Sequence, residues 1–173
     1  MNFTSFPTLI TERLLLRQLK TDDAEDIRII RSHPEVNRYI ERPKTTTLAD
    51  SLAFIEKINI SIASHESLYW AISLKEQGQL TGTVCVFHFN EAENTAEIGY
   101  ELHPDMQGKG IAQEAVAKVI DYISNNLQLN ALVAWVQPGN IKSVQLLEKN
   151  NFKFTKFAEE KPEFAIYKLS LKN

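Results

Sequence analysis

The chain has 173 residues, of which 43% are hydrophobic and 24% charged, a composition that excludes a disordered or fibrous protein. Its 22 acidic and 19 basic residues leave a net charge of −3, so charge gives no support to a nucleic-acid or acidic-membrane partner. A single cysteine, Cys85, excludes an intrachain disulfide and a multi-thiolate zinc site.

The sequence shows no sign of a targeting segment or of a membrane span. Residues 1–7 lack the basic start and apolar centre of a signal peptide, and no apolar stretch approaches the roughly eighteen residues that a span needs. We therefore expect a cytoplasmic protein without a membrane partner. No linker or repeat divides the chain, which predicts one domain over residues 1–173. Monomer and homodimer both remain open.

The N-terminal third predicts one strand and two helices. The strand covers 13–19, and the polar cluster 21–23 opens a helix that ends near Pro34. A second helix is expected over about 47–64, where apolar residues recur at spacings of three and four. These apolar residues are Leu48, Leu52, Ile55, Ile58 and Ile62.

The remainder predicts a strand meander and then alternating helices and strands. Residues 67–74, 80–89 and 95–102 are rich in β-branched and aromatic residues and form three antiparallel strands in this interpretation. Beyond Pro104, the periodicity predicts a helix through Ile111 and Ile123, a strand over 131–136, a helix over 140–150, and strands over 152–157 and 164–171. The strand, helix and strand between 95 and 136 imply a right-handed crossover and a parallel pair. The fold class is α/β with a mixed sheet.

A glycine-bearing loop follows the strand that ends at Leu102. Gly108 and Gly110 remove side chains where a backbone can approach an anion, and the next helix begins directly after them. The loop lacks the Gly-x-x-x-x-Gly-Lys-Ser/Thr pattern of a P-loop and the third glycine of a dinucleotide fingerprint. It therefore predicts either a phosphate site of another kind or only a tight turn.

With a second segment, 140–152, this loop resembles the GNAT family of acetyl-coenzyme A-dependent N-acetyltransferases. The family's pyrophosphate motif, Gln/Arg-x-x-Gly-x-Gly/Ala, is matched by Gln107, Gly110 and Ala112. Its later motif, Asn-x-x-Ser/Ala-x-x-Leu-(Tyr)-Glu-Lys-x-Gly-Phe, is matched by Asn140, Ser143, Leu146, Glu148, Lys149 and Phe152. Residues 9–17 also resemble the opening strand of the branch that acetylates ribosomal-protein N-termini.

The chain departs from the family pattern at two positions. Leu147 stands where many members carry a tyrosine that protonates the leaving thiolate, so this role does not transfer and Ser143 becomes the candidate donor. Asn151 replaces the glycine before Phe152, and we expect asparagine to tolerate the left-handed backbone there.

The resemblance implies a mixed, mostly antiparallel sheet of about seven strands with a splayed parallel pair in the middle, flanked by about four helices. It also implies acetyl-CoA as cosubstrate, with the pantetheine arm in the gap between the splayed strands. The cofactor-binding residues that it implies are Leu102, His103, Gln107, Gly108, Lys109, Gly110, Ile111, Ala112, Asn140 and Ser143.

The chemistry is the attack of an amine on a thioester, which needs a free nitrogen lone pair, stabilisation of the oxyanion and a proton for the thiolate. Glu97 is the candidate base, acting through water, and Ser143 is the candidate proton donor. Tyr39 and Arg42 lie in the segment 36–43, which corresponds to the part that shapes the acceptor site in GNAT relatives.

An α-amine with a pKa near 8 is about one-seventh deprotonated at pH 7, whereas a lysine near 10.4 is neutral only about four times in ten thousand. A site with a modest carboxylate and a serine therefore favours a protein N-terminus. The alternatives are a small-molecule amine, such as a polyamine, amino acid or aminoglycoside, and a non-catalytic acetyl-CoA-binding module.

The other reactive residues are expected to be structural. The four histidines, His33, His65, His88 and His103, have no metal-ligand spacing, so we expect no metal. Cys85 lies in an apolar strand and is expected in the core rather than as a nucleophile. Trp70 and Trp135 are also expected in the core.

Overall fold

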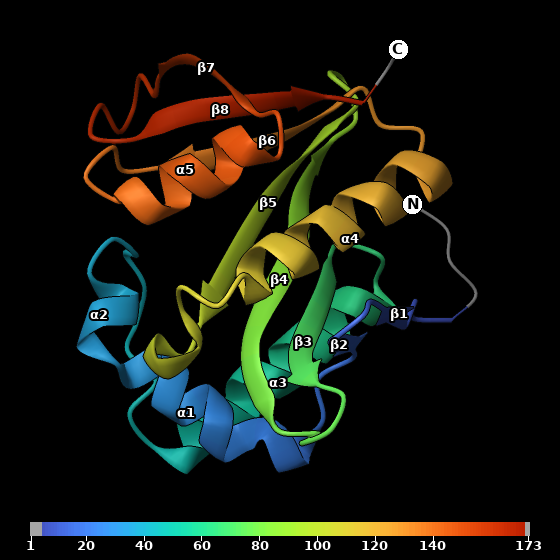
Figure 1. The fold of residues 1–173 in the computed structure, drawn as a ribbon, viewed down its shortest axis with the longest axis vertical. Coiled ribbons are helices and arrows are strands. Elements are labelled where there is room, and N and C mark those ends of the chain that lie inside the picture. Colours follow the sequence, from blue (N-terminus) through green and yellow to red (C-terminus); the bar gives the residue numbers. More distant parts are fainter. Residues whose placement is uncertain (1–4, 172–173) are drawn as a thin grey trace.

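The computed structural model describes residues 5–171 (Figure 1). Residues 1–4 and 172–173 lie outside the described range. The prediction of a cytoplasmic location rests in part on residues 1–4. Its centre is an eight-stranded sheet in the order β1-β2-β3-β4-β5-β6-β8-β7. The strands are β1 (Leu9–Ile10), β2 (Leu14–Arg17), β3 (Leu68–Leu74), β4 (Leu80–Asn90), β5 (Thr95–Leu102), β6 (Ala131–Val136), β7 (Lys153–Phe157) and β8 (Ala165–Ser170). The helices are α1 (Ala24–Ser32), α2 (Pro34–Asn37), α3 (Leu48–Ala63), α4 (Ile111–Asn126) and α5 (Ile141–Lys149). Single turns of 3₁₀ helix cover Thr21–Asp23 and Pro104–Met106.

Helices cover both faces of the central strands, and the two-residue period of a strand divides the core accordingly. Leu68, Trp70 and Ile72 of β3 pack in a cluster with α4, while Tyr69 and Ala71 pack in a second cluster with α1 and α3. In Figure 1, α4 crosses one face of the sheet and α1 and α3 lie on the other. This arrangement explains why β3 is buried along most of its length and reads as a continuous apolar run.

The strands β5 and β6 form the only parallel pair among the described residues, and they separate after three residue pairs. The pairing covers Thr95–Glu97 of β5 against Ala131–Val133 of β6. Beyond Glu97, β5 continues beside β4 as far as Leu102, while β6 turns away toward β8 (Figure 1). The parallel pair expected from the order of elements, and the splaying that the GNAT resemblance implies, are both confirmed.

The predicted fold class and its larger elements are confirmed, with two additions. The sheet has eight strands rather than about seven because the short β1 pairs with β2, and two residues are too few to show a strand pattern. The sequence predicts no separate helix over the four residues of α2, because one turn has no measurable period; Pro34 begins it. Asn151 has φ 66°, which confirms the left-handed backbone expected there.

Two expectations for the core need correction. Trp70 is fully buried, but Trp135 is 42% exposed because it lies on β6 beyond the last pair with β5, where the sheet opens. Cys85 packs against the core and also lines the cavity that the opening creates. Within residues 5–171, no helix is long and apolar enough to cross a membrane.

Candidate active site

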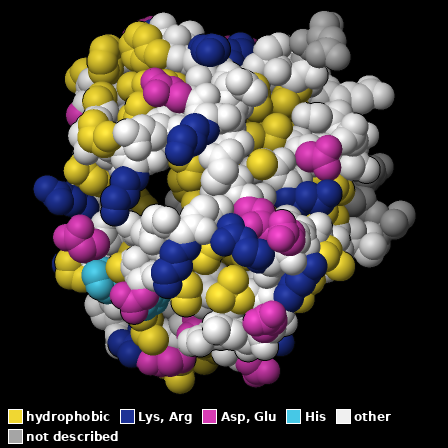
Figure 2. All heavy atoms as spheres, viewed as in Figure 1, with side chains coloured by type: hydrophobic (Ala, Val, Ile, Leu, Met, Phe, Trp, Pro, Cys, Tyr) yellow, Lys and Arg dark blue, Asp and Glu magenta, His cyan; other side chains and the backbone are white. Residues whose placement is uncertain are grey.

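A cavity of about 890 Å³ lies where β5 and β6 separate. One wall is the edge of β5 from Ile98 to Leu102, and Ala134–Val136 of β6 face it. The start of α4, α5 and the segment from α1 to Arg42 form further parts of the lining. Phe54 of α3, Tyr69 of β3, and Thr83, Cys85 and Phe87 of β4 also line the cavity. Figure 2 shows its mouth as a hollow between the surfaces over α5 and α2, with Lys and Arg side chains around it.

The loop before α4 lines one end of this cavity with Gln107, Gly108 and Gly110. Gly108 and Gly110 have φ of 74° and 76°, a left-handed conformation that glycine adopts without strain. Gly110 is the N-cap of α4, and no side chain caps the helix there, so the first amides of α4 remain available. An uncapped N-terminus of a 16-residue helix beside a glycine loop is a suitable site for a pyrophosphate.

Residues far away in the sequence hold this loop in place. Arg13 Nη1 donates to the carbonyl oxygen of Lys109 at 2.9 Å, and Arg13 Nε donates to Glu114 Oε2 at 2.7 Å. Thr11 and the Arg13 backbone donate to the other oxygen of Glu114. Partial burial opposes ionisation of Glu114, but these hydrogen bonds hold its pKa below the ordinary value. The segment 9–17, noted for its family resemblance, thus anchors the loop 107–110, which we call the phosphate loop after its candidate role.

The helix α5 closes the cavity from the side opposite β5. Asn140 is its N-cap, and Asn140 Oδ1 accepts a hydrogen bond from the Ser143 amide at 3.3 Å. Lys142 Nζ lies 3.3 Å from Gln107 Oε1 and so connects α5 to the phosphate loop. Leu147 is almost fully buried in the core. The missing tyrosine therefore leaves an apolar contact and no polar group at this position.

A tyrosine of β5, Tyr100, contacts α5 at Ser143. The hydroxyl oxygens of Tyr100 and Ser143 are 2.7 Å apart, and both residues line the cavity. Burial raises the pKa of Tyr100 to about 12, opposed by the hydrogen bond with Ser143, so the phenol stays protonated at neutral pH. Sequence reasoning missed Tyr100, because its partner Ser143 lies 43 positions away on another element and no local pattern links the two.

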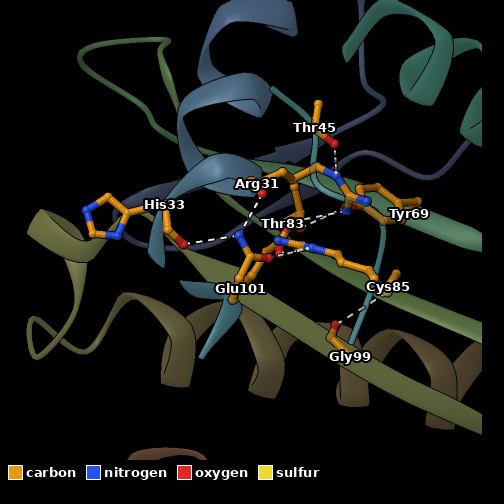
Figure 3. A network of polar contacts seen from close by, with 10 residues as sticks. Arg31, His33, Thr45, Tyr69, Thr83, Cys85, Gly99 and Glu101 are labelled. Carbon is orange, nitrogen blue, oxygen red and sulfur yellow. Dashed lines mark hydrogen bonds and ion pairs between the residues drawn. The ribbon is translucent and has the colours of Figure 1, made fainter. Parts of the chain in front are cut away.

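The other end of the cavity contains a polar network around Glu101 (Figure 3). Arg42 Nη1 donates to Glu101 Oε2 at 2.5 Å, and Arg31 Nη1 lies 3.8 Å from Glu101 Oε1. Thr83 Oγ1 lies 3.5 Å from the same oxygen and accepts a hydrogen bond from Tyr69. Glu101 and Arg31 were also missed, because their partners come from separate strands and loops.

Most of the predicted site residues line this one cavity. Those that do are Tyr39, Arg42, Leu102, Gln107, Gly108, Gly110, Ile111, Ala112, Asn140 and Ser143. The other three are Glu97, His103 and Lys109. Glu97 Oε1 lies 3.3 Å from His88 Nδ1, on the paired part of β5, so its assignment as base stays a prediction. His103 Nδ1 caps the turn at Asp105, and the Lys109 carbonyl binds Arg13.

Cys85 is poorly suited to nucleophilic chemistry. Burial, with the nearby charge of Glu101, raises the pKa of its thiol to about 12. Its Sγ lies 3.6 Å from the carbonyl oxygen of Gly99, which accepts its weak hydrogen bond. No group of three or more His, Cys, Asp or Glu residues in the described part of the chain is arranged to hold a metal ion.

The GNAT acetyltransferase domain model matches residues 13–153 of this sequence. The chain is also 38% identical over 146 residues to the uncharacterized N-acetyltransferase p20 of Bacillus licheniformis, which covers 84% of this chain and 82% of that protein. The chain belongs to the GNAT acetyltransferase family. As a GNAT protein, it is an acetyl-CoA-dependent N-acetyltransferase.

Solved structures share the GNAT fold. The Microcin C7 self immunity acetyltransferase MccE, in complex with acetyl-CoA and AMP, is 24% identical with a TM-score of 0.80, over 92% of this chain and 93% of that one. RimL, the ribosomal L7/L12 alpha-N-protein acetyltransferase in complex with coenzyme A, is 15% identical with a TM-score of 0.83, over 95% of this chain and 98% of that one. The open β5 edge and the uncapped start of α4 fit a pantetheine arm and a pyrophosphate in this GNAT chain.

Proposed function

We propose that this GNAT enzyme acetylates the N-terminal α-amine of a protein, such as a ribosomal protein. The observation that carries this proposal is the state of the carboxylates in the cavity. Among the carboxylates of the described residues, only those of Glu35 and Glu101 line the cavity. Glu35 is exposed, and Glu101 forms an ion pair with Arg42. A site without a free buried carboxylate favours an amine that is already partly deprotonated.

The pKa values of the two amine classes make this preference large. Freeing an α-amine at pH 7 costs about 1 kcal/mol, whereas freeing a lysine side chain costs about 4.6 kcal/mol. The resemblance of residues 9–17 to the ribosomal-protein branch and the fold shared with RimL also support a protein N-terminus. A ribosomal-protein acceptor agrees with the expectation of a cytoplasmic enzyme.

Different groups of the cavity have different roles in the proposed reaction. Acetyl-CoA supplies the thioester; the new N–C bond forms as the C–S bond breaks, and one proton moves overall from nitrogen to sulfur. The amides at the start of α4 bind the pyrophosphate. Amides on the open edge of β5 donate to the carbonyl oxygen of the acetyl group.

Ser143 and Tyr100 act together on the leaving sulfur. When the Tyr100 hydroxyl donates to Ser143 Oγ, the Ser143 proton is free to face the sulfur. The high pKa of Tyr100 keeps the phenol available as a donor. This pair takes the place of the family tyrosine that Leu147 replaces.

Glu97 remains our candidate base. Because it does not line the cavity, it receives the amine proton only through water. Since a low-pKa α-amine needs little help, a distant base of this kind is sufficient.

Competition between amines tests the proposal. Peptides with a free N-terminus and one lysine are incubated with acetyl-CoA, and the modified nitrogen is identified by mass spectrometry. We expect the α-amine to be acetylated at least a hundredfold faster than the lysine side chain. Equal modification of both amines contradicts the proposal. Acetylation of free amino acids or aminoglycosides, but of no peptide, would favour a small-molecule acceptor.

A further inference from the structure

The acceptor end of the cavity carries more positive than negative buried charge. The side chains of Arg31 and Arg42 are 12% and 13% exposed, and both face Glu101, whose side chain is 5% exposed. Two guanidinium groups therefore share one carboxylate. Burial lowers the pKa of Arg31, Glu101 opposes this effect, and the charge of Arg42 adds to it. A positive charge in a mostly buried position is costly unless a partner neutralises it.

One nitrogen of this arginine pair, Arg42 Nη2, is buried without a partner in the described structure. Arg42 Nη2 is buried and without a hydrogen bond, while Arg42 Nε binds Asn37 and Nη1 binds Glu101. Arg31 forms one described hydrogen bond, from Nε to Thr45, and its guanidinium lies 3.8 Å from the centre of the Phe54 ring. Each guanidinium has five N–H donors, and an unsatisfied buried donor is unfavourable.

Both arginines line the same cavity as the acetyl-transfer site. We infer that Arg31 and Arg42 bind an anionic group, a carboxylate or a phosphate, that the amine acceptor itself carries. This inference rests on the proposed function, because it assigns the chemical class of the acceptor at that site. The planar guanidinium matches both anions through paired hydrogen bonds.

This assignment has two consequences for the choice of amine. A positive pair near the acceptor favours the neutral form of the incoming nitrogen, because like charge lowers an amine pKa. The same charge disfavours polyamines, which carry further ammonium groups and no anion. The pair therefore selects against polycations and aids deprotonation where no free buried carboxylate is present.

Matched acceptors test the inference on the wild-type enzyme. The peptide arm compares Ala-Asp-Gly-amide with Ala-Asn-Gly-amide, and the small-molecule arm compares aspartic acid α-amide with asparagine α-amide. Each pair differs by one negative charge and little in size. We expect kcat/KM to favour the acidic member of at least one pair by about tenfold or more. The arm that responds identifies the source of the anion.

Two arginine variants test whether the preference for the acidic acceptor depends on this arginine pair. Arg42→Gln should reduce the preference for the acidic member to about twofold or less, while the KM for acetyl-CoA stays unchanged. Arg28→Gln is the matched control, because Arg28 lies on α1 like Arg31 but pairs with Glu25 outside the cavity. Glu101→Gln should have the opposite effect and increase the preference for the acidic member. It removes the one negative charge that Arg31 and Arg42 share. A purely structural network would change thermal stability without this reversal of sign.

Binding provides a readout that does not depend on turnover. The N-acetylated form of each matched compound is titrated by calorimetry into the enzyme with CoA. Tighter binding of the acidic form supports the inference even if the α-amine proposal fails in the competition assay. Equal binding of both members in both arms, or equal kcat/KM for all of them, overturns it. If Arg42→Gln does not fold, the wild-type comparison and Glu101→Gln still decide the outcome.

Discussion

The two ends of the cavity differ in how far apart in the sequence their lining residues lie. The end proposed for the cofactor is lined by residues of two short sequence segments, 107–113 and 140–143, and its candidate phosphate site is the uncapped backbone at the start of α4. The end proposed for the acceptor is lined by side chains from α1, the segment after α2, and three strands. These side chains are Arg31, Arg42, Tyr69, Thr83 and Glu101. A backbone site depends on local conformation, whereas a side-chain site depends on which distant elements the fold brings together.

This difference separates the general part of the reaction from the specific part. Amides and a helix N-terminus bind a phosphate whatever acceptor is used. Buried charges discriminate between acceptors through their sign and number. Substitutions at the two ends should therefore affect different kinetic parameters.

The largest effect is expected at Tyr100, which lies on the cavity wall and contacts α5. Tyr100→Phe keeps the ring but removes the donor to Ser143, so kcat should fall about a hundredfold with little change in the KM for acetyl-CoA. Steady-state kinetics measure both parameters. Tyr122→Phe is the control, since Tyr122 packs on Trp70 outside the cavity. An unchanged kcat would remove Tyr100 from the proposed donor pair.

The next largest effect is expected for Gly110→Ala, which tests the proposed cofactor end. Gly110→Ala forces a left-handed alanine, and its Cβ would lie 3.3 Å from Arg13 Nη2, so the amides of the loop should lose their alignment. We expect the Kd for acetyl-CoA, measured by calorimetry, to rise about tenfold.

Gly78→Ala is the matched control for Gly110→Ala. Gly78 has φ +67°, no atom within 4 Å of the added Cβ, and a position in the turn between β3 and β4. It should lower thermal stability by a comparable amount without changing acetyl-CoA affinity. If both variants weaken acetyl-CoA binding equally, the loss reflects general destabilisation and the phosphate assignment of the loop is wrong.

A smaller effect is expected for Glu97→Gln. Because an α-amine is about one-seventh deprotonated at pH 7, losing a base that acts through water should slow the reaction by about sevenfold at most. The loss should shrink to nothing above about pH 9, where the amine is already free. A pH profile of kcat/KM measures this change. A full rate for the variant at every pH would remove Glu97 as the base.

The smallest effect concerns the anchor of the phosphate loop. The folded-state pKa of Glu114 is lowered from 4.5, so its hydrogen bonds with Thr11 and Arg13 contribute stability at neutral pH that is lost as the pH falls below about 4.5. The contribution is about 1 kcal/mol or less, because Arg13 is half exposed.

Thermal unfolding at several pH values measures the contribution of Glu114. The difference between the wild type and Glu114→Gln should be present at pH 7 and should shrink toward pH 3.5. Glu12→Gln, at an exposed neighbour, is the control. A difference that grows at low pH would contradict the lowered pKa.

The elements that the sequence predicted best were long or strongly patterned. The periodicity of α3 and α4, the apolar strands β3 and β6 and the motif around Gly110 all depend on neighbours within a few residues. The misassigned parts depend on contacts between distant segments. Trp135 reads as a core residue on an apolar strand, but the separation of β5 and β6 leaves it at the open edge.

The sequence by itself determined the α/β fold class and the family. It also located the glycine loop proposed to bind the cofactor, because glycine conformation and a helix start are local properties. Only the tertiary structure decided that Tyr100 meets Ser143, that Arg13 holds the phosphate loop, and that two arginines share Glu101. The physical reason is distance along the chain. Arg42 and Glu101 are 59 positions apart, and no local pattern in the sequence records that the fold places them in one cavity.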